Sequence, residues 1–176
     1  MKKALVSTTL LGVLMGAGLF IQTSVYAETA NNTTANITIN GGGLNIDNLA
    51  SIDFGSITLN GKKQTISPKT PAAPILSIHD YRGKTDGWSL QAGYEKDKAL
   101  GGGMTLKLNP SSDQGGTVSQ VSLSTTMAPI YKLTKADLDK QDTNLTLNPT
   151  IDVPANTPAT NYTGTIVWNA VEGAPA

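Results

Sequence analysis

Residues 75–92 read ILSIHDYRGKTDGWSLQA, and they predict two β-strands joined by a polar turn. Ile75 to Asp80 is a nearly continuous apolar run, and Trp88, Leu90 and Ala92 alternate with polar residues. Alternate residues of a strand point to the same side, so a period of two is typical of a strand with one buried face. Glycine and charged residues separate the two runs, as expected at a turn.

The same period of two recurs along the chain, with glycine- and proline-rich breaks between the runs. Only residues 135–140 suggest a helical turn. The pattern predicts an all-β fold, an antiparallel β-sandwich or flattened Greek-key barrel of about 8–11 short strands with little helix. The further alternating runs are Ile37–Ile39, Leu44–Ile46, Ile52–Phe54, Ile57–Leu59, Met104–Leu108, Val118–Leu123, Leu145–Leu147, Ile151–Val153 and Tyr162–Val171.

The first 27 residues have the three parts of a secretory signal peptide. A cationic start is followed by an apolar run from Leu10 to Ile21, and the small residues Val25 and Ala27 predict cleavage before Glu28. A membrane anchor is the alternative, but this run is shorter than the about 20 residues that a spanning helix needs. We therefore expect an exported protein that is either free outside the cell or retained there without a covalent bond.

Cleavage leaves 149 residues, which is the size of one domain. Residues 28–36 form a polar tract rich in Thr and Asn without periodicity, and we expect a flexible leader there. Residues 37–176 then form the β-sandwich domain. A chain of about 150 residues buries roughly 68–70% of its unfolded surface. Its hydrophobic core can therefore stabilise the fold without disulfide bonds or a structural metal.

Charge and cysteine content narrow the class of partner. The whole chain has 13 basic and 13 acidic residues, and losing Lys2 and Lys3 with the signal leaves 11 against 13. A DNA-binding protein typically neutralises about 6–10 phosphates, so we expect no nucleic-acid partner. The absence of cysteine excludes disulfides, thiolate metal sites and a lipid-modified N-terminal cysteine.

Four motifs in order resemble those of the WxL family, which comprises cell-surface proteins of Gram-positive bacteria. The resemblance covers about residues 37–176, although the glycine expected before Tyr162 is replaced by Asn161. The matching stretches are Asp53–Ser56, similar to a Phe-Gly motif; Asp80–Gly83 with Gly87–Leu90, similar to D-x-R-G…G-W-x-L; Val153-Pro154; and Tyr162–Trp168, similar to the family's closing stretch.

The resemblance implies a non-catalytic protein that is attached non-covalently to peptidoglycan or another wall glycan. It also implies a subunit of a surface complex, whose partners are larger wall-associated proteins, often membrane-anchored and encoded alongside. An adhesin component that contacts host matrix or another surface protein is the second hypothesis. A small secreted hydrolase is the third and weakest.

The second tripeptide departs from the family pattern. It reads Trp168-Asn169-Ala170, with alanine where the family usually has leucine. Trp168 and Ala170 point to the same face of a strand, so three carbons are lost beside the indole. At a buried position that loss costs about 2–5 kcal/mol unless a neighbour fills the space. At a ligand-facing position it weakens or widens a contact.

Trp88 with Leu90, and Trp168 with Ala170, are either core residues or a binding platform. Tryptophan in a half-buried strand usually packs in the core. Alternatively an indole stacks on a sugar or anchors a partner protein. Glycine precedes both motifs and permits close backbone contact, which supports the hypothesis that the two strands lie together and form one patch.

Asp80, Arg82 and Asp86 frame the turn before Trp88, and two interpretations are open. In the first, a salt bridge and Asx-type hydrogen bonds pin the loop. In the second, Arg82, the only arginine, binds a carboxylate of a stem peptide or partner protein with its two-pronged guanidinium.

Catalytic and metal sites are weakly indicated. His79 is the only histidine, and the chain lacks the G-x-S-x-G elbow of serine hydrolases. Nothing makes Asp80 and Asp86 a glycosidase pair rather than part of a turn. Asp137, Asp139 and Asp142 lie among lysines and fail the calcium-loop spacing. We therefore predict no enzyme activity, no cofactor and no metal.

Overall fold

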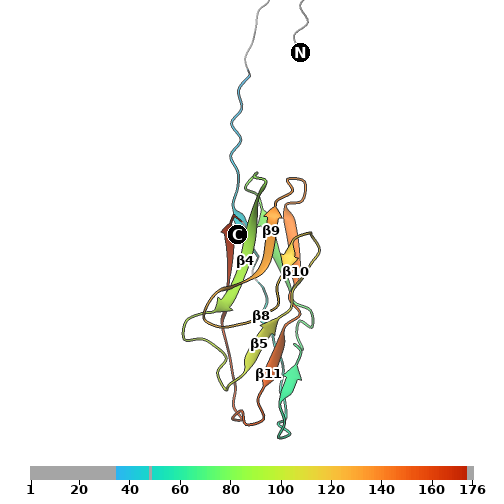
Figure 1. Cartoon of the computed structure of the whole chain (residues 1–176), viewed down its shortest axis with the longest axis vertical. Helices are drawn as coiled ribbons and strands as arrows, with labels where there is room; N and C mark the ends of the chain where they lie inside the picture. The colour runs from blue at the N-terminus through green and yellow to red at the C-terminus, as the bar shows by residue number, and fades with distance from the viewer. Residues whose placement is uncertain (1–34, 48, 174–176) are drawn as a thin grey trace, which may run out of the picture. The chain divides into compact units, whose positions relative to one another are not determined.

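Within residues 35–47 and 49–173, which the computed structural model describes, the chain forms twelve β-strands and no helix (Figure 1). The predicted all-β fold is confirmed as a sandwich, and its sheets do not close into a barrel. The strands are β1 (Leu44–Ile46), β2 (Gln64–Ile66), β3 (Ile75–Asp80), β4 (Asp86–Tyr94), β5 (Thr105–Leu108), β6 (Ser111–Ser112), β7 (Thr117–Val118), β8 (Val121–Ser122), β9 (Ala128–Lys135), β10 (Asp142–Thr146), β11 (Thr150–Val153) and β12 (Ile166–Glu172).

Several expected elements differ from the sequence prediction. The run Ile37–Ile39 is not a strand, residues 57–59 are not a strand, and residues 135–140 form the end of β9 and a loop instead of a helical turn. The strand β9 was not expected. The predicted signal peptide lies outside the described residues, as does most of the predicted leader.

Three antiparallel sheets make up the sandwich. Sheet 1 has the order β1-β3-β10-β6, sheet 2 has β2-β11-β5-β8, and sheet 3 has β12-β4-β9-β7. Sheets 1 and 2 are connected through the chain, because β10 leads directly into β11 and β5 into β6. At the first junction Leu147 donates to the carbonyl of Pro74 at 2.9 Å, and Asn148 has a φ of 42° where the strand direction changes.

The hydrophobic core collects the inward residues of all three sheets. In β3 the inward residues are Leu76 and Ile78 of the apolar run. In β4 they are Trp88, Leu90 and Ala92, as the period of two predicted. The indole of Trp88 lies against the ring of Tyr131, with ring centroids 5.1 Å apart. The remaining core residues are Tyr94, Leu106, Leu108, Leu123, Ile130, Leu145, Leu147, Ile151 and Val153.

The pairing of β4 with β9 contains an irregularity. Its register shifts between Leu90 and Gln91, so that Tyr131 faces Leu90 while Pro129 faces Gln91. The extra residue on β9 is Ile130. A bulge of this kind interrupts strict alternation, which explains why the consecutive residues Ile130 and Tyr131 are both buried.

Gly87 allows β4 to approach β9 closely at the start of the tryptophan motif. A Cβ atom added to Gly87 would lie 2.0 Å from the carbonyl oxygen of Leu133 and 2.6 Å from that of Thr134. Both contacts are with backbone, which cannot move away as a flexible side chain can. Glycine is therefore required for the close strand contact that positions Trp88.

We expect Gly87→Ala to lower the free energy of unfolding by about 3 kcal/mol, the upper end of the usual cost of overpacking. Gly115→Ala is the matched control, because a Cβ there would meet no atom within 4 Å. It should change stability by less than about 0.5 kcal/mol. Urea denaturation of both variants measures the difference, and equal stabilities would contradict the close approach.

Candidate functional site

The two tryptophan motifs lie side by side on neighbouring strands of sheet 3. Strand β12 pairs with β4 so that Ala170 faces Leu90 and Trp168 faces Ala92. Directly opposite residues of an antiparallel pair share a face of the sheet. The hypothesis that the two strands lie together is confirmed, and both motifs belong to one face.

That shared face is the inner face of the sheet. Trp88 is 1% exposed and Leu90 is 0% exposed, whereas Trp168 and Ala170 are half-buried and pack against the edge of the core. The indole nitrogen of Trp88 finds no hydrogen-bond acceptor among the described residues, so this side chain contributes through apolar packing. Trp88 and Leu90 offer almost no surface to a ligand in this arrangement.

Ala170 lies between the two situations that the sequence left open. It is neither fully buried nor on the outer face, because β12 is an edge strand of sheet 3. Strand β1, the edge strand of sheet 1, contacts β12 on this side of the sandwich. The side-chain carbons that alanine lacks relative to leucine would therefore lie at the border of the core.

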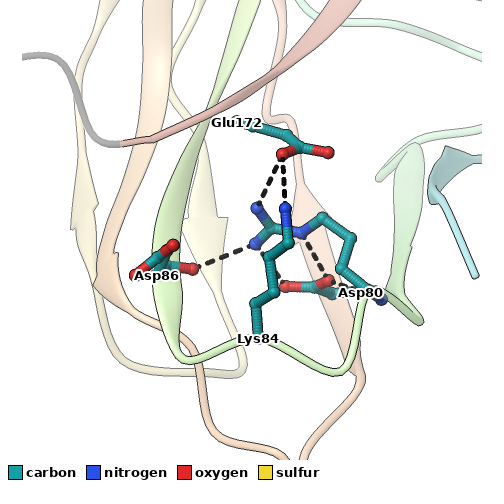
Figure 2. A network of polar contacts seen from close by, with 5 residues as sticks. Asp80, Lys84, Asp86 and Glu172 are labelled. Atoms are coloured by element: carbon teal, nitrogen blue, oxygen red, sulfur yellow. Dashed lines mark hydrogen bonds and ion pairs between the residues drawn. The ribbon is translucent and has the colours of Figure 1, made fainter. Parts of the chain in front are cut away.

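Arg82 organises the turn between β3 and β4 (Figure 2). Its Nε donates to Oδ1 of Asp80 at 2.8 Å, and its Nη2 donates to Oδ2 of the same carboxylate at 2.8 Å. The backbone amide of Arg82 also donates to Asp80 Oδ1 at 3.3 Å, which is an Asx-type contact. The Asp80 carboxylate thus accepts hydrogen bonds from two nitrogens of the guanidinium.

The same guanidinium connects the turn to β4 and β12. Nη2 donates to the backbone carbonyl of Asp86 at 3.0 Å, and Nη1 lies 3.9 Å from Glu172 Oε2. Lys84 reaches Glu172 from the solvent side at 3.4 Å. The Arg82 side chain is only 2% exposed, so the contact with Asp80 is made away from bulk water.

The electrostatics of the pair follow from this contact. The hydrogen bonds from Arg82 hold the pKa of Asp80 below its ordinary value, although burial acts in the opposite direction. The hydrogen bond to Asp80 likewise raises the pKa of Arg82. The geometry matches the structural interpretation of these residues, because the guanidinium is already occupied by a carboxylate of the same chain.

We expect Arg82→Lys to lower the free energy of unfolding by about 3 kcal/mol, because an ammonium group cannot replace the two-pronged contact and leaves a buried carboxylate poorly paired. Lys84→Ala removes a solvent-exposed ion pair at the same turn and should cost less than about 1 kcal/mol. Thermal denaturation of both variants compares the stability lost in Arg82→Lys with that lost in Lys84→Ala. Equal effects would show that charge alone matters at Arg82.

A second polar group lies on sheet 1, where the sequence analysis found only a weak indication of a site. His79 Nδ1 lies 2.7 Å from Asp142 Oδ1, and Nε2 lies 3.2 Å from Asp47 Oδ2. The imidazole therefore bridges β10 and the residue that follows β1. Two hydrogen bonds raise the pKa of His79 above 6.5. The one with Asp142 has the larger effect, and the one with Asp47 the smaller.

This bridge predicts a pH-dependent stability. Because the folded state favours the protonated imidazole, its contribution is fully present below about pH 6.5 and is lost as the pH rises through the raised pKa of His79. Denaturant midpoints measured from about pH 5 to about pH 9 should fall across this range in the wild type. The decrease should be absent in His79→Asn, and its persistence there would assign it to another group.

The predicted alternatives involving catalysis and calcium find no assembled site in the described part of the chain. Both ring nitrogens of His79 face carboxylates, and neither meets a serine hydroxyl. Asp142 pairs with His79 instead of joining Asp137 and Asp139. Among residues 35–47 and 49–173, no three His, Cys, Asp or Glu side chains group as metal ligands, and no helix is long and apolar enough to cross a membrane.

A sequence model described as "WxL domain surface cell wall-binding" matches residues 23–173. This protein belongs to the WxL family. The match covers both tryptophan motifs, the Arg82 turn and all twelve strands of the WxL protein. No curated protein and no solved structure matches the chain.

Membership assigns this WxL protein to the cell surface as a wall-binding domain. The family description concerns binding and names no reaction. Two features of the structure explain the motifs around Arg82 and Trp88 in this protein. The first is the packing of β4 between β12 and β9, and the second is the Arg82 clamp of the turn that leads into β4.

Proposed function

We propose that this WxL protein is a non-catalytic subunit of a surface complex that holds to peptidoglycan without a covalent bond. After export and cleavage before Glu28, larger wall- or membrane-associated proteins encoded alongside would be its protein partners. The observation that carries the proposal is the wall-binding family match over residues 23–173. A fold in which both family motifs stabilise one sheet supports it.

The chemistry of the polar residues favours binding over catalysis. A serine or threonine hydroxyl is commonly activated as a nucleophile by an adjacent base within hydrogen-bonding distance. In the described residues, Asp80 is hydrogen-bonded to Arg82, and the two ring nitrogens of His79 contact Asp47 and Asp142. These groups hold one another in place and are not paired with a reactive hydroxyl.

The seven candidate residues take two roles in this proposal. Trp168 and Ala170 at the edge of sheet 3, with the exposed Asp86 at the start of β4, would contact the wall or a partner protein. The others would act by positioning these three. They are the buried or half-buried residues Trp88, Leu90, Arg82 and Asp80.

The first test is sedimentation of the mature protein with insoluble peptidoglycan sacculi, in parallel with capture of detergent-solubilised envelope proteins. We expect the protein to pellet with sacculi and to capture a larger surface protein. If it stays in the supernatant and captures no envelope component, the proposed function is wrong. Capture of host matrix proteins without wall binding would instead favour an adhesin.

Trp168→Ala tests the edge of sheet 3 within the same experiment. We expect its affinity for sacculi or partner to fall at least about fivefold, the scale of a removed interface aromatic. Val167→Ala is the matched control, because this neighbour on β12 points to the opposite face and is exposed. Near-ultraviolet circular dichroism shows whether the aromatic core is intact in each variant.

A further inference from the structure

The exposed Tyr81, which follows β3, forms an aromatic pair with the half-buried His79. The ring of Tyr81 stacks on the imidazole of His79 with centroids 5.6 Å apart and an interplanar angle of 14°. Tyr81 remains 44% exposed, although large aromatic side chains are usually buried in the core or at interfaces. The packing of the sandwich does not account for this exposure.

The pair belongs to a continuous polar face. In β3, Leu76 and Ile78 point to the core, so Ser77 and His79 point outward. His79 is flanked in register by Asn45 on β1 and by Asp142 on β10. The next row along the strands contains Ser77, whose hydroxyl lies 2.7 Å from Asn144 Oδ1.

The carboxylates on this face are held in position and stay open to solvent. The side chains of Asp47 and Asp142 are 63% and 65% exposed, and each contacts His79 through one oxygen. An ionised carboxylate has about four acceptor sites, so most of its capacity remains unused. Bridging by one imidazole fixes the two acceptors beside the aromatic ring without occupying them.

Sheet 2 provides a contrast within the same chain. On its outer face Asp152 is bound by Lys63 at 2.8 Å, by Lys107 at 2.9 Å and by Thr65 at 2.6 Å, and its side chain is only 10% exposed. The polar groups there satisfy one another. The outer face of sheet 1 instead presents acceptors and an aromatic ring to solvent.

We propose that the Tyr81 face, defined by Asn45, Asp47, His79, Tyr81, Asp142 and Asn144, binds uncharged saccharide units of the wall glycan strand. The apolar C–H face of a pyranose ring would stack on Tyr81, as planar aromatic rings accept flat apolar ligands. Hydroxyl and acetamido N–H groups would donate to Asp47 and Asp142. This site rests on the proposed wall attachment and names the ligand that would be bound.

Charge distinguishes a neutral glycan from other wall components. Within the Tyr81 face the carboxylates of Asp47 and Asp142 outnumber the imidazole of His79, so phosphate-rich polymers are disfavoured there. The glycan backbone of peptidoglycan is uncharged where the lactyl carboxyl is amide-linked to the stem peptide. Protein interfaces have cores depleted of charged residues, so this charged face does not resemble one.

The test is a binding isotherm with purified sacculi, with the β-1,4-linked tetramer of N-acetylglucosamine as a soluble competitor. We expect the tetramer to reduce binding of the wild type. Tyr81→Ala should bind sacculi at least about tenfold more weakly, because an exposed aromatic contact is lost, while Tyr81→Trp should retain binding. Leu138→Ala, at another exposed apolar residue, is the control and should leave the affinity unchanged.

The carboxylates have their own matched pair of variants. Asp142→Asn should weaken binding about fivefold, the effect of one lost charge-assisted hydrogen bond in water. Asp139→Asn removes the same charge from an exposed loop residue outside this face and should have no effect. Equal weakening by both variants would show that net charge, and not this face, controls binding, and would overturn the assignment.

The outcomes separate this site from the proposed function. If the wild type pellets with sacculi but Tyr81→Ala binds equally well, the Tyr81 face is wrong while wall attachment stands. Binding that the tetramer does not reduce, or that requires the anionic polymers of unstripped walls, also overturns the site. If the wild type binds neither sacculi nor the tetramer, the Tyr81 face is wrong, and the proposed function is wrong as well if no envelope component is captured. Melting temperatures of the variants show whether each remains folded.

Discussion

The two-pronged contact between Arg82 and Asp80 is the interaction on which the arrangement of the strands depends. It closes the turn between β3 and β4, which belong to different sheets, and it reaches the carbonyl of Asp86 and the carboxylate of Glu172. One buried cation therefore connects the end of β3 in sheet 1 with β4 and β12 of sheet 3. Removing one partner of such a pair leaves an uncompensated buried charge, which is why geometry as well as charge matters here.

The burial of Trp88 follows from this constraint. With the turn clamped and Gly87 against the backbone of β9, the indole points into the core and meets Tyr131. The tryptophan motif of β4 is thus mainly a packing motif, and its partner on β12 completes the border of the core. In the two proposals, recognition would therefore take place at the edge of sheet 3 and on the outer face of sheet 1, where Tyr81 meets solvent. A rigid scaffold with exposed acceptors is suited to holding a polymer.

Several parts of the fold could be predicted because their signals are local. The alternation in β4, β5 and β11 identifies the inner residues, and the motifs around Arg82 and Trp88 identify the turn. The strand β9 escaped prediction because Pro129 and the bulge at Ile130 interrupt its alternation. The run Ile37–Ile39 has the alternation of a strand but pairs with no strand in the described residues. Periodicity shows that a segment can form a strand, and only a hydrogen-bonded neighbour makes it one.

For the candidate site too, some features could be predicted from the sequence, and others depend on the tertiary structure. The sequence by itself determined that Trp88 and Trp168 occupy strands, that Arg82 has carboxylates near it, and that the chain belongs among wall-binding surface proteins. Only the tertiary structure decided that Trp88 faces inward, that Arg82 is already occupied, and that His79 brings Asp47 and Asp142 together beside Tyr81. The physical reason is register. His79 and Asp142 are 63 residues apart, and their contact exists only because β3 and β10 pair with those two positions opposite each other.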